Sequence, residues 1–162
     1  MEQEKQKKMI TILVPAYNEE EVLDMLYERL KTIMNQNTKY DFEILLVNDG
    51  SKDSTFEIMQ ELRKKDKRVC YLNLSRNFGK ETAMIAGLDY CNGDAVVIID
   101  ADLQDPPELI PEMIKYWEEG YDDIYAKRRT RGEESWLRRQ FSLAFYGILQ
   151  RMSRIDILPN VG

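Results

Sequence analysis

Two aspartates, Asp100 and Asp102, directly follow residues 95–99, the most apolar short segment of the chain. Carboxylates two residues apart at the end of a strand can share one hard divalent cation, with the amide oxygen of Gln104 as a further ligand. Such a cation would bridge the oxygens of a diphosphate. The alternative is that both aspartates merely cap a helix beginning near Pro107. We favour the metal site, because an unpaired carboxylate at the end of a fully apolar strand is unfavourable.

The composition restricts the chemistry that these carboxylates can support. The 162 residues include no histidine, which excludes Ser-His-Asp and Cys-His catalysis, a histidine general base and histidine metal ligands. A metal must therefore be held mainly by oxygen, which favours Mg²⁺ or Mn²⁺ over zinc. Cys70 and Cys91 form no CxxC motif, and we interpret them as reduced thiols of a cytosolic domain.

Polar clusters also follow two earlier apolar segments. Residues 15–19 are Pro-Ala-Tyr-Asn-Glu, and residues 48–53 are Asn-Asp-Gly-Ser-Lys-Asp. Each cluster alone fits an ordinary polar loop, but three clusters at three strand ends favour one shared site. The chain has no GxGxxG and no GxxxxGK[ST] motif. A nucleotide bound here therefore needs another way to neutralise its phosphates, and a cation on Asp100 and Asp102 supplies one.

The spacing of apolar residues predicts alternating strands and helices. Strands are expected at residues 10–14, 43–47, 69–74, 95–99 and 123–126. Helices are expected at residues 20–34, 54–65, 80–91, 107–117 and 136–152. This order predicts an α/β fold with a Rossmann-like, mainly parallel sheet and helices on both faces. Ligands bind such sheets beyond the carboxyl ends of the strands, where the three polar clusters lie.

Charge is distributed unevenly along the chain. The net charge is −6, but residues 126–154 contain eight basic and two acidic residues, so that stretch carries +6 and the rest −12. The acidic balance argues against nucleic-acid binding, while the basic stretch fits a phosphate or an anionic membrane surface. A solvated helix face is the plain alternative for the basic stretch. Without a signal peptide or a bilayer-spanning apolar run, we expect a soluble, cytoplasmic domain.

Four motifs resemble those of family 2 glycosyltransferases of the GT-A fold. They are residues 14–19 (Val-Pro-Ala-Tyr-Asn-Glu), 47–55 (Val-Asn-Asp-Gly-Ser-Lys-Asp-Ser-Thr), 76–81 (Arg-Asn-Phe-Gly-Lys-Glu) and 100–107 (Asp-Ala-Asp-Leu-Gln-Asp-Pro-Pro). The last two are most similar to polyprenyl-phosphate glycosyltransferases, the branch that includes dolichyl-phosphate mannose synthase and bactoprenol glucosyltransferase. The resemblance runs from about Ile10 to the last residue.

The resemblance implies a binding site for a nucleotide-sugar donor. Glu19 is expected to bind the ribose hydroxyls, and Asp49 to accept a hydrogen bond from the base, usually uracil or guanine. The nucleotide-binding residues that it implies are Pro15, Ala16, Tyr17, Glu19, Asp49 and Lys80. It implies that Asp100, Asp102 and Gln104 are the ligands of Mg²⁺ or Mn²⁺, with Asp100 and Asp102 as the catalytic carboxylates.

The resemblance also implies an inverting, metal-dependent transfer of the sugar to a polyprenyl phosphate. Arg128, Arg138 and Ser142 best match the residues that hold the acceptor phosphate, with Arg129 or Arg139 as alternative arginines. A phosphate monoester, with a second pKa of about 6, is already anionic near pH 7 and needs positioning more than deprotonation. That acceptor suits a chain with arginines and no histidine.

Other functions remain open at this point. A growing polysaccharide is the alternative acceptor, and its hydroxyl would need a carboxylate base. A non-catalytic nucleotide-binding or membrane-peripheral module is the alternative from another class. A nucleotidyltransferase is disfavoured, because the chain has no Gly-rich, basic N-terminal loop.

We divide the chain into three parts. Residues 1–9 are expected to form a flexible arm, residues 10–126 the nucleotide-sugar-binding GT-A core, and residues 127–162 a basic, membrane-proximal segment on the acceptor side. In the resembling proteins an Asp-Phe-Arg-Leu-type segment and transmembrane helices follow, so we expect a truncated chain with a complete donor site and an incomplete acceptor site. The full-length protein is expected at the inner face of the membrane. The apolar side of the last helix suits a membrane surface or a homo-oligomer.

Overall fold

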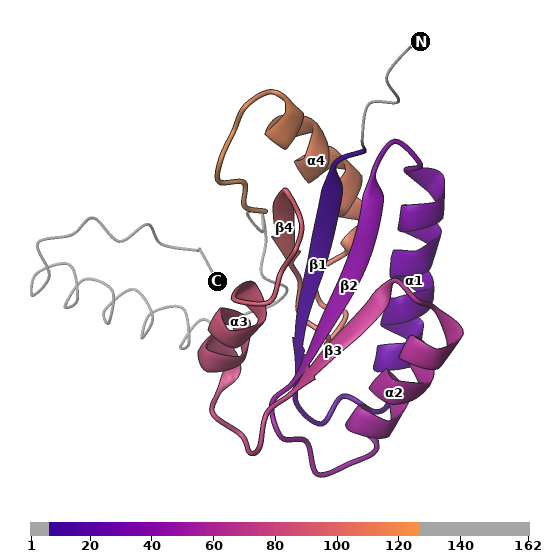
Figure 1. The fold of residues 1–162 in the computed structure, drawn as a ribbon, viewed down its shortest axis with the longest axis vertical. Helices are drawn as coiled ribbons and strands as arrows, with labels where there is room; N and C mark the ends of the chain where they lie inside the picture. Colours follow the sequence, from indigo (N-terminus) through magenta and orange to yellow (C-terminus); the bar gives the residue numbers. More distant parts are fainter. Residues whose placement is uncertain (1–6, 127–162) are drawn as a thin grey trace, which may run out of the picture.

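The computed structural model describes residues 7–126, which contain a four-stranded sheet in the order β3-β2-β1-β4 with every neighbouring pair parallel (Figure 1). Its strands are β1 (Met9–Ala16), β2 (Asp41–Asn48), β3 (Val69–Asn73) and β4 (Ala95–Ile98). The helices are α1 (Leu23–Gln36), α2 (Thr55–Lys65), α3 (Lys80–Leu88), the short 3₁₀ helix η1 (Pro107–Leu109) and α4 (Ile110–Glu118). The predicted α/β fold with a mainly parallel sheet is confirmed.

Helices cover both faces of this sheet. Alternate β1 side chains such as Ile10 and Ile12 belong to the core that includes residues of α1, α2 and α4, whereas Leu13 belongs to a second core on the α3 side. Figure 1 shows α1 and α2 on one side of the sheet and α3 on the other. On the α3 side, a Cβ on Gly87 would lie 2.9 Å from the side chain of Val47, so this glycine lets the helix pack directly on the strands.

The order of strands reverses at β1. From β1 the chain moves through β2 to β3 at one edge, with α1 and α2 as the connections, and α3 then crosses the opposite face to place β4 beside β1. β1 and β4 are neighbours, so the loops that follow them lie at the same edge of the sheet, at the point where the strand order reverses. Ligands bind open α/β sheets in the crevice at such a point. The polar clusters predicted after these two strands lie at that point.

Some element boundaries differ from the prediction. Residues 123–126 form no strand in the described structure, because only Ile124 is half-buried and its neighbours are exposed, which leaves no face to pack. The helix expected from Glu20 begins at Leu23. Residues 20–22 form a turn, in which the backbone N–H of Glu20 donates to the Asp53 carboxylate of the loop after β2. The strand expected from Ile10 begins at Met9, whose N–H donates to Asp94.

Several expectations concern residues outside the described range. The predicted helix at residues 136–152 and the acceptor-phosphate residues Arg128, Arg138 and Ser142 lie outside it, as do residues 1–6 of the arm. Within residues 7–126, no helix combines the length and the apolar character that crossing a bilayer requires. Both cysteines are free thiols and half-buried.

An aspartate after α2 links three elements of the fold. The Asp66 carboxylate accepts a hydrogen bond from Arg68 Nη2 at 2.7 Å and another from the Tyr27 hydroxyl of α1 at 3.1 Å. The hydrogen bonding from Arg68 lowers the pKa of Asp66 to about 2, against the opposing effect of burial. The ionised carboxylate therefore stabilises the folded state more than the unfolded one.

This low pKa predicts part of the acid sensitivity of the fold. Asp66 contributes its full stabilisation above the ordinary pKa of 3.8, and the contribution disappears as the pH falls toward about 2. We expect Asp66→Asn to lower the free energy of unfolding at pH 7 by about 2 kcal/mol, and by progressively less below pH 4. Urea unfolding at pH 7, 4 and 3 measures this difference. Asp41→Asn, which removes an exposed carboxylate, is the control. An equal loss at every pH would contradict the prediction.

Candidate functional site

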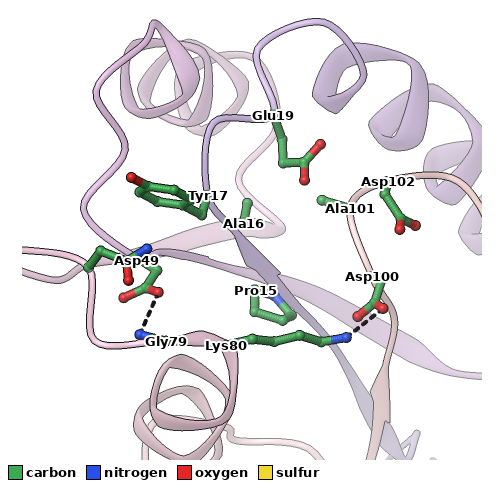
Figure 2. A pocket seen from close by; sticks show the side chains of 11 residues that line it. Pro15, Ala16, Tyr17, Glu19, Asp49, Gly79, Lys80, Asp100, Ala101 and Asp102 are labelled. Atoms are coloured by element: carbon green, nitrogen blue, oxygen red, sulfur yellow. Dashed lines mark hydrogen bonds and ion pairs between the residues drawn. The ribbon is translucent and has the colours of Figure 1, made fainter. Parts of the chain in front are cut away.

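A pocket opens over the ends of β1, β2 and β4 and the start of α3 (Figure 2). The residues predicted to bind the nucleotide or the metal that line it are Pro15, Ala16, Tyr17, Glu19, Asp49, Lys80, Asp100 and Asp102. Its lining also includes Asn77, Gly79 and Ala101, which the sequence did not single out. Gln104, the third predicted metal ligand, is exposed and does not line the pocket.

Hydrogen bonds between the loops after β1 and β2 position Tyr17 and Glu19. The N–H of Glu19 donates to Thr55 Oγ1 at 2.8 Å, and the N–H of Lys52 donates to Asn18 Oδ1 at 2.8 Å. Asn18 has a φ of 57°, a left-handed conformation that asparagine adopts more readily than most residues. These contacts were not predicted, although the short polar side chains in both loops were a signal that such bonds could form.

Asp49 is almost fully buried and anchors the loop that leads into α3. Its Oδ1 accepts a hydrogen bond from the N–H of Phe78 at 2.7 Å, and its Oδ2 accepts one from the N–H of Gly79 at 2.9 Å. The sequence suggested only a contact with the base for this aspartate. That contact stays a prediction and is compatible with the anchoring, because each carboxylate oxygen can accept a second hydrogen bond.

Asp100 and Asp102 lie across the pocket from Asp49 (Figure 2). Asp100 Oδ2 forms an ion pair with Lys80 Nζ at 2.6 Å. Asp102 is exposed, and its Oδ1 accepts a hydrogen bond from the N–H of Gln104 at 3.0 Å. The backbone of Gln104 therefore helps to orient Asp102, a different role from the one predicted for its side chain.

Negative charge accumulates at this end of the pocket. The pKa of Glu19 is raised, first by burial and then by the negative charges of Asp102, Asp53 and Asp100. Neighbouring negative charges that raise the pKa of a carboxyl group in this way favour a bound cation, which relieves their repulsion. The electrostatics thus support a cation-binding site next to the ends of β1 and β4.

The carboxylates suit a hard divalent cation that arrives together with a ligand. Residues 7–126 contain no group of three acidic or thiol side chains that could hold a metal by themselves. Asp100 and Asp102 offer two carboxylates, and Mg²⁺ sites commonly combine one or two carboxylates with substrate phosphates and water. The residues therefore fit Mg²⁺ or Mn²⁺ bound jointly with a diphosphate.

Comparison with proteins of known sequence shows close relatives. The sequence model described as glycosyl transferase family 2 matches residues 11–161. A glycosyltransferase of Bacillus subtilis, YkcC, is 51% identical over 94% of this chain and 47% of its own length. The prophage bactoprenol glucosyl transferase homolog of Escherichia coli is 42% identical over 94% of this chain and 50% of its own length. The chain thus spans about half the length of the curated relatives it matches.

Solved structures agree with these sequence matches at the level of the fold. The mannosyltransferase PcManGT from Pyrobaculum calidifontis, solved in complex with GDP-Man and Mn²⁺, superposes with a TM-score of 0.57 at 22% identity. The match covers 90% of this chain and 39% of the mannosyltransferase. This similarity confirms the predicted GT-A fold. The match of the family model over residues 11–161 establishes that the chain belongs to glycosyl transferase family 2.

Proposed function

We propose that the protein transfers a sugar from a UDP- or GDP-sugar to a polyprenyl phosphate, with inversion at the anomeric carbon and dependence on Mg²⁺ or Mn²⁺. The observation that carries the proposal is the pocket at the switch point of the sheet, where Asp49 lies on one side and Asp100 and Asp102 on the other. A base at the first side and a diphosphate at the second match the order of groups along a nucleotide-sugar, whose diphosphate lies between the nucleoside and the sugar.

The pocket suggests a role for each donor-side residue. Tyr17 lies near Asp49 in Figure 2, so we place the base between these two side chains. We place the ribose hydroxyls at Glu19, whose backbone is fixed by Thr55. Pro15 and Ala16 form the part of the pocket wall at the end of β1 and would contact the nucleoside.

The carboxylates after β4 serve the chemical step. Asp100 and Asp102 would hold Mg²⁺ or Mn²⁺, which when bound stabilises the negative charge of the departing nucleoside diphosphate. The backbone N–H of Gln104 orients the Asp102 carboxylate at the mouth of the pocket. Gln104 would complete the ligand set only after its side chain turned toward the pocket.

The acceptor assignment rests on the relatives and on charge. The Escherichia coli relative, at 42% identity, carries the name of a bactoprenol glucosyl transferase homolog. An acceptor phosphate oxygen is anionic near pH 7 and can attack the anomeric carbon without a histidine base. We propose that Arg128, Arg138 and Ser142 bind this phosphate. In this division residues 10–126 form the donor core and residues 127–162 the acceptor side, and the whole protein acts at the inner face of a membrane.

Calorimetry tests the donor half of the proposal. We expect UDP or GDP, and the corresponding nucleotide-sugars, to bind the 162-residue chain in the presence of Mn²⁺ and to bind much more weakly in EDTA. The same titrations choose between uridine and guanosine. If no nucleotide of either type binds with Mn²⁺ present, the proposed function is wrong.

Transfer of a labelled sugar tests the acceptor half. The assay uses a short polyprenyl phosphate as acceptor, and an oligosaccharide as the competing acceptor, with a chain extended beyond Gly162. Transfer to the lipid phosphate, with inversion read from the anomeric configuration by NMR, supports the proposal. Transfer to the oligosaccharide alone would show a polysaccharide-type enzyme.

A further inference from the structure

Lys80 reaches across the floor of the pocket to the carboxylate of Asp100 (Figure 2). The two residues are 20 positions apart, and they come from the first turn of α3 and the end of β4. Their ion pair measures 2.6 Å from Nζ to Oδ2, with 53% of the Lys80 side chain and 31% of the Asp100 side chain exposed. A pair this open to solvent can be broken by a competing ion, because exposed ion pairs contribute little net stability.

The charges around this ion pair are unbalanced. The residues that line the described pocket include four carboxylates, those of Glu19, Asp49, Asp100 and Asp102, but a single cationic side chain, that of Lys80. A diphosphate entering this pocket would meet a net negative surface unless a further cation came with it. Lys80 Nζ contacts an oxygen of Asp100 that a divalent cation would also use.

We propose that Lys80 exchanges partners during donor binding. In the empty site it neutralises Asp100, and in the donor complex it leaves Asp100 and pairs with an oxygen of the donor diphosphate, while Asp100 turns to the divalent cation. This inference rests on the proposed function, because it assumes a nucleoside diphosphate as the ligand. It adds that one lysine makes cation binding and nucleotide binding depend on each other.

The attachment of Lys80 suits such an exchange. Its backbone is fixed, because it begins α3 directly after Gly79, whose N–H is held by Asp49 at 2.9 Å. Its side chain is a mobile four-carbon stem that carries a point charge, which can serve carboxylate and phosphate partners in turn. An arginine at this position would instead bind Asp100 through two parallel hydrogen bonds and resist displacement.

The exchange has a thermodynamic consequence that differs from simple phosphate binding. A lysine that only contacts phosphate would leave the affinity for the cation alone unchanged when removed. A lysine that also occupies Asp100 competes with the cation, so its removal should strengthen cation binding in the absence of nucleotide. Its removal should also reduce the enhancement of cation affinity by nucleotide, because the nucleotide then no longer draws a competing lysine away from Asp100.

Measurement of Mn²⁺ binding by electron paramagnetic resonance, with and without saturating UDP or GDP, tests the exchange. We compare the wild type with Lys80→Met, which keeps the length of the side chain and removes its charge. Without nucleotide, Lys80→Met should bind Mn²⁺ about fivefold more tightly, and the enhancement of Mn²⁺ affinity by nucleotide should shrink by the same factor, about fivefold. Lys65→Met removes an exposed lysine at the end of α2, outside the pocket, and should change neither value.

The outcomes separate this inference from the proposed function. If wild-type protein shows no Mn²⁺-dependent binding of UDP or GDP, the proposed function fails and the inference with it. If the wild type binds both ligands interdependently and Lys80→Met retains the same enhancement, the partner exchange is wrong while the proposed function stands. Lys80→Gln serves as a second variant, and circular dichroism confirms that each variant is folded before its titration is compared.

Discussion

Asp102→Asn should abolish metal-dependent binding of the nucleotide-sugar and lower the rate of sugar transfer by about 100-fold or more. Asparagine keeps the shape of the side chain and its Oδ1, so it can still accept the 3.0 Å hydrogen bond from the N–H of Gln104. The turn after β4 should therefore stay folded. What disappears is the negative charge that a divalent cation requires, and Asp100 alone is already paired with Lys80.

Calorimetry with UDP and Mn²⁺, and transfer assays on the extended chain, measure this loss. Asp89→Asn is the matched control, because it removes an exposed carboxylate at the far end of α3, about 13 Å along the helix from Lys80. The control should bind UDP and Mn²⁺ as the wild type does. Retention of Mn²⁺-dependent binding by Asp102→Asn would show that the metal, if it binds, uses other ligands.

The strands of the fold were predictable because each one is a short apolar segment that can be recognised from neighbouring residues in the sequence. β1, β2, β3 and β4 all lie within two residues of their predicted bounds, since each is an apolar segment between clear breaks such as Asn48-Asp49-Gly50. The strand order was not predicted. It depends on which face α3 crosses, and this follows from contacts between distant segments, such as the close approach of Gly87 to Val47.

The candidate site shows the same division between local pattern and distant contact. The presence of Glu19 and Asp102 at the pocket follows from their positions directly after strands, which is a local property. The anchoring of the α3 loop by Asp49 joins residues 29 and 30 positions apart, and the Lys80–Asp100 ion pair joins residues 20 apart. No local sequence pattern specifies such contacts between distant residues, so they could not be predicted from the sequence.

The predicted strand at residues 123–126 failed for a related reason. A strand needs a neighbouring strand with free backbone groups and a face that can be buried. The residue types of a short segment alone give only a weak preference for strand structure. Ile124 is the sole half-buried residue of that segment, with Asp123 and Tyr125 exposed on either side of it. The prediction of a strand at residues 123–126 was therefore wrong, because it rested on strand propensity in a segment that buries no face.

Gly50→Ala should lower both the stability of the fold and the affinity for nucleotide, because Gly50 packs against the loop that leads to the donor site. Gly50 has a φ of +67°, and a Cβ at this position would lie 2.6 Å from Arg76 Cα and 2.6 Å from the backbone nitrogen of Asn77. Those are backbone atoms, so they cannot rotate away as a side chain would. The added methyl group must push the 76–79 loop away from the turn after β2.

The displacement would act on Asp49 next to it. The hydrogen bonds from Phe78 and Gly79 to Asp49 would lengthen or break, leaving a buried carboxylate without partners. We expect Gly50→Ala to lower the free energy of unfolding by about 3 kcal/mol, from strain, steric overlap and the lost hydrogen bonds together. Nucleotide affinity should fall by about tenfold or more, because Lys80 follows this loop directly.

Gly120→Ala separates the two causes of this loss. Gly120 also has a positive φ, +97°, but a Cβ there would meet no described atom within 4 Å. It should therefore lose only about 1 kcal/mol, from the left-handed backbone conformation alone, and keep the nucleotide affinity of the wild type. Urea unfolding and calorimetry of both variants give the comparison. Equal losses in the two variants would mean that the contact between the turn after β2 and the 76–79 loop does not hold the donor site together.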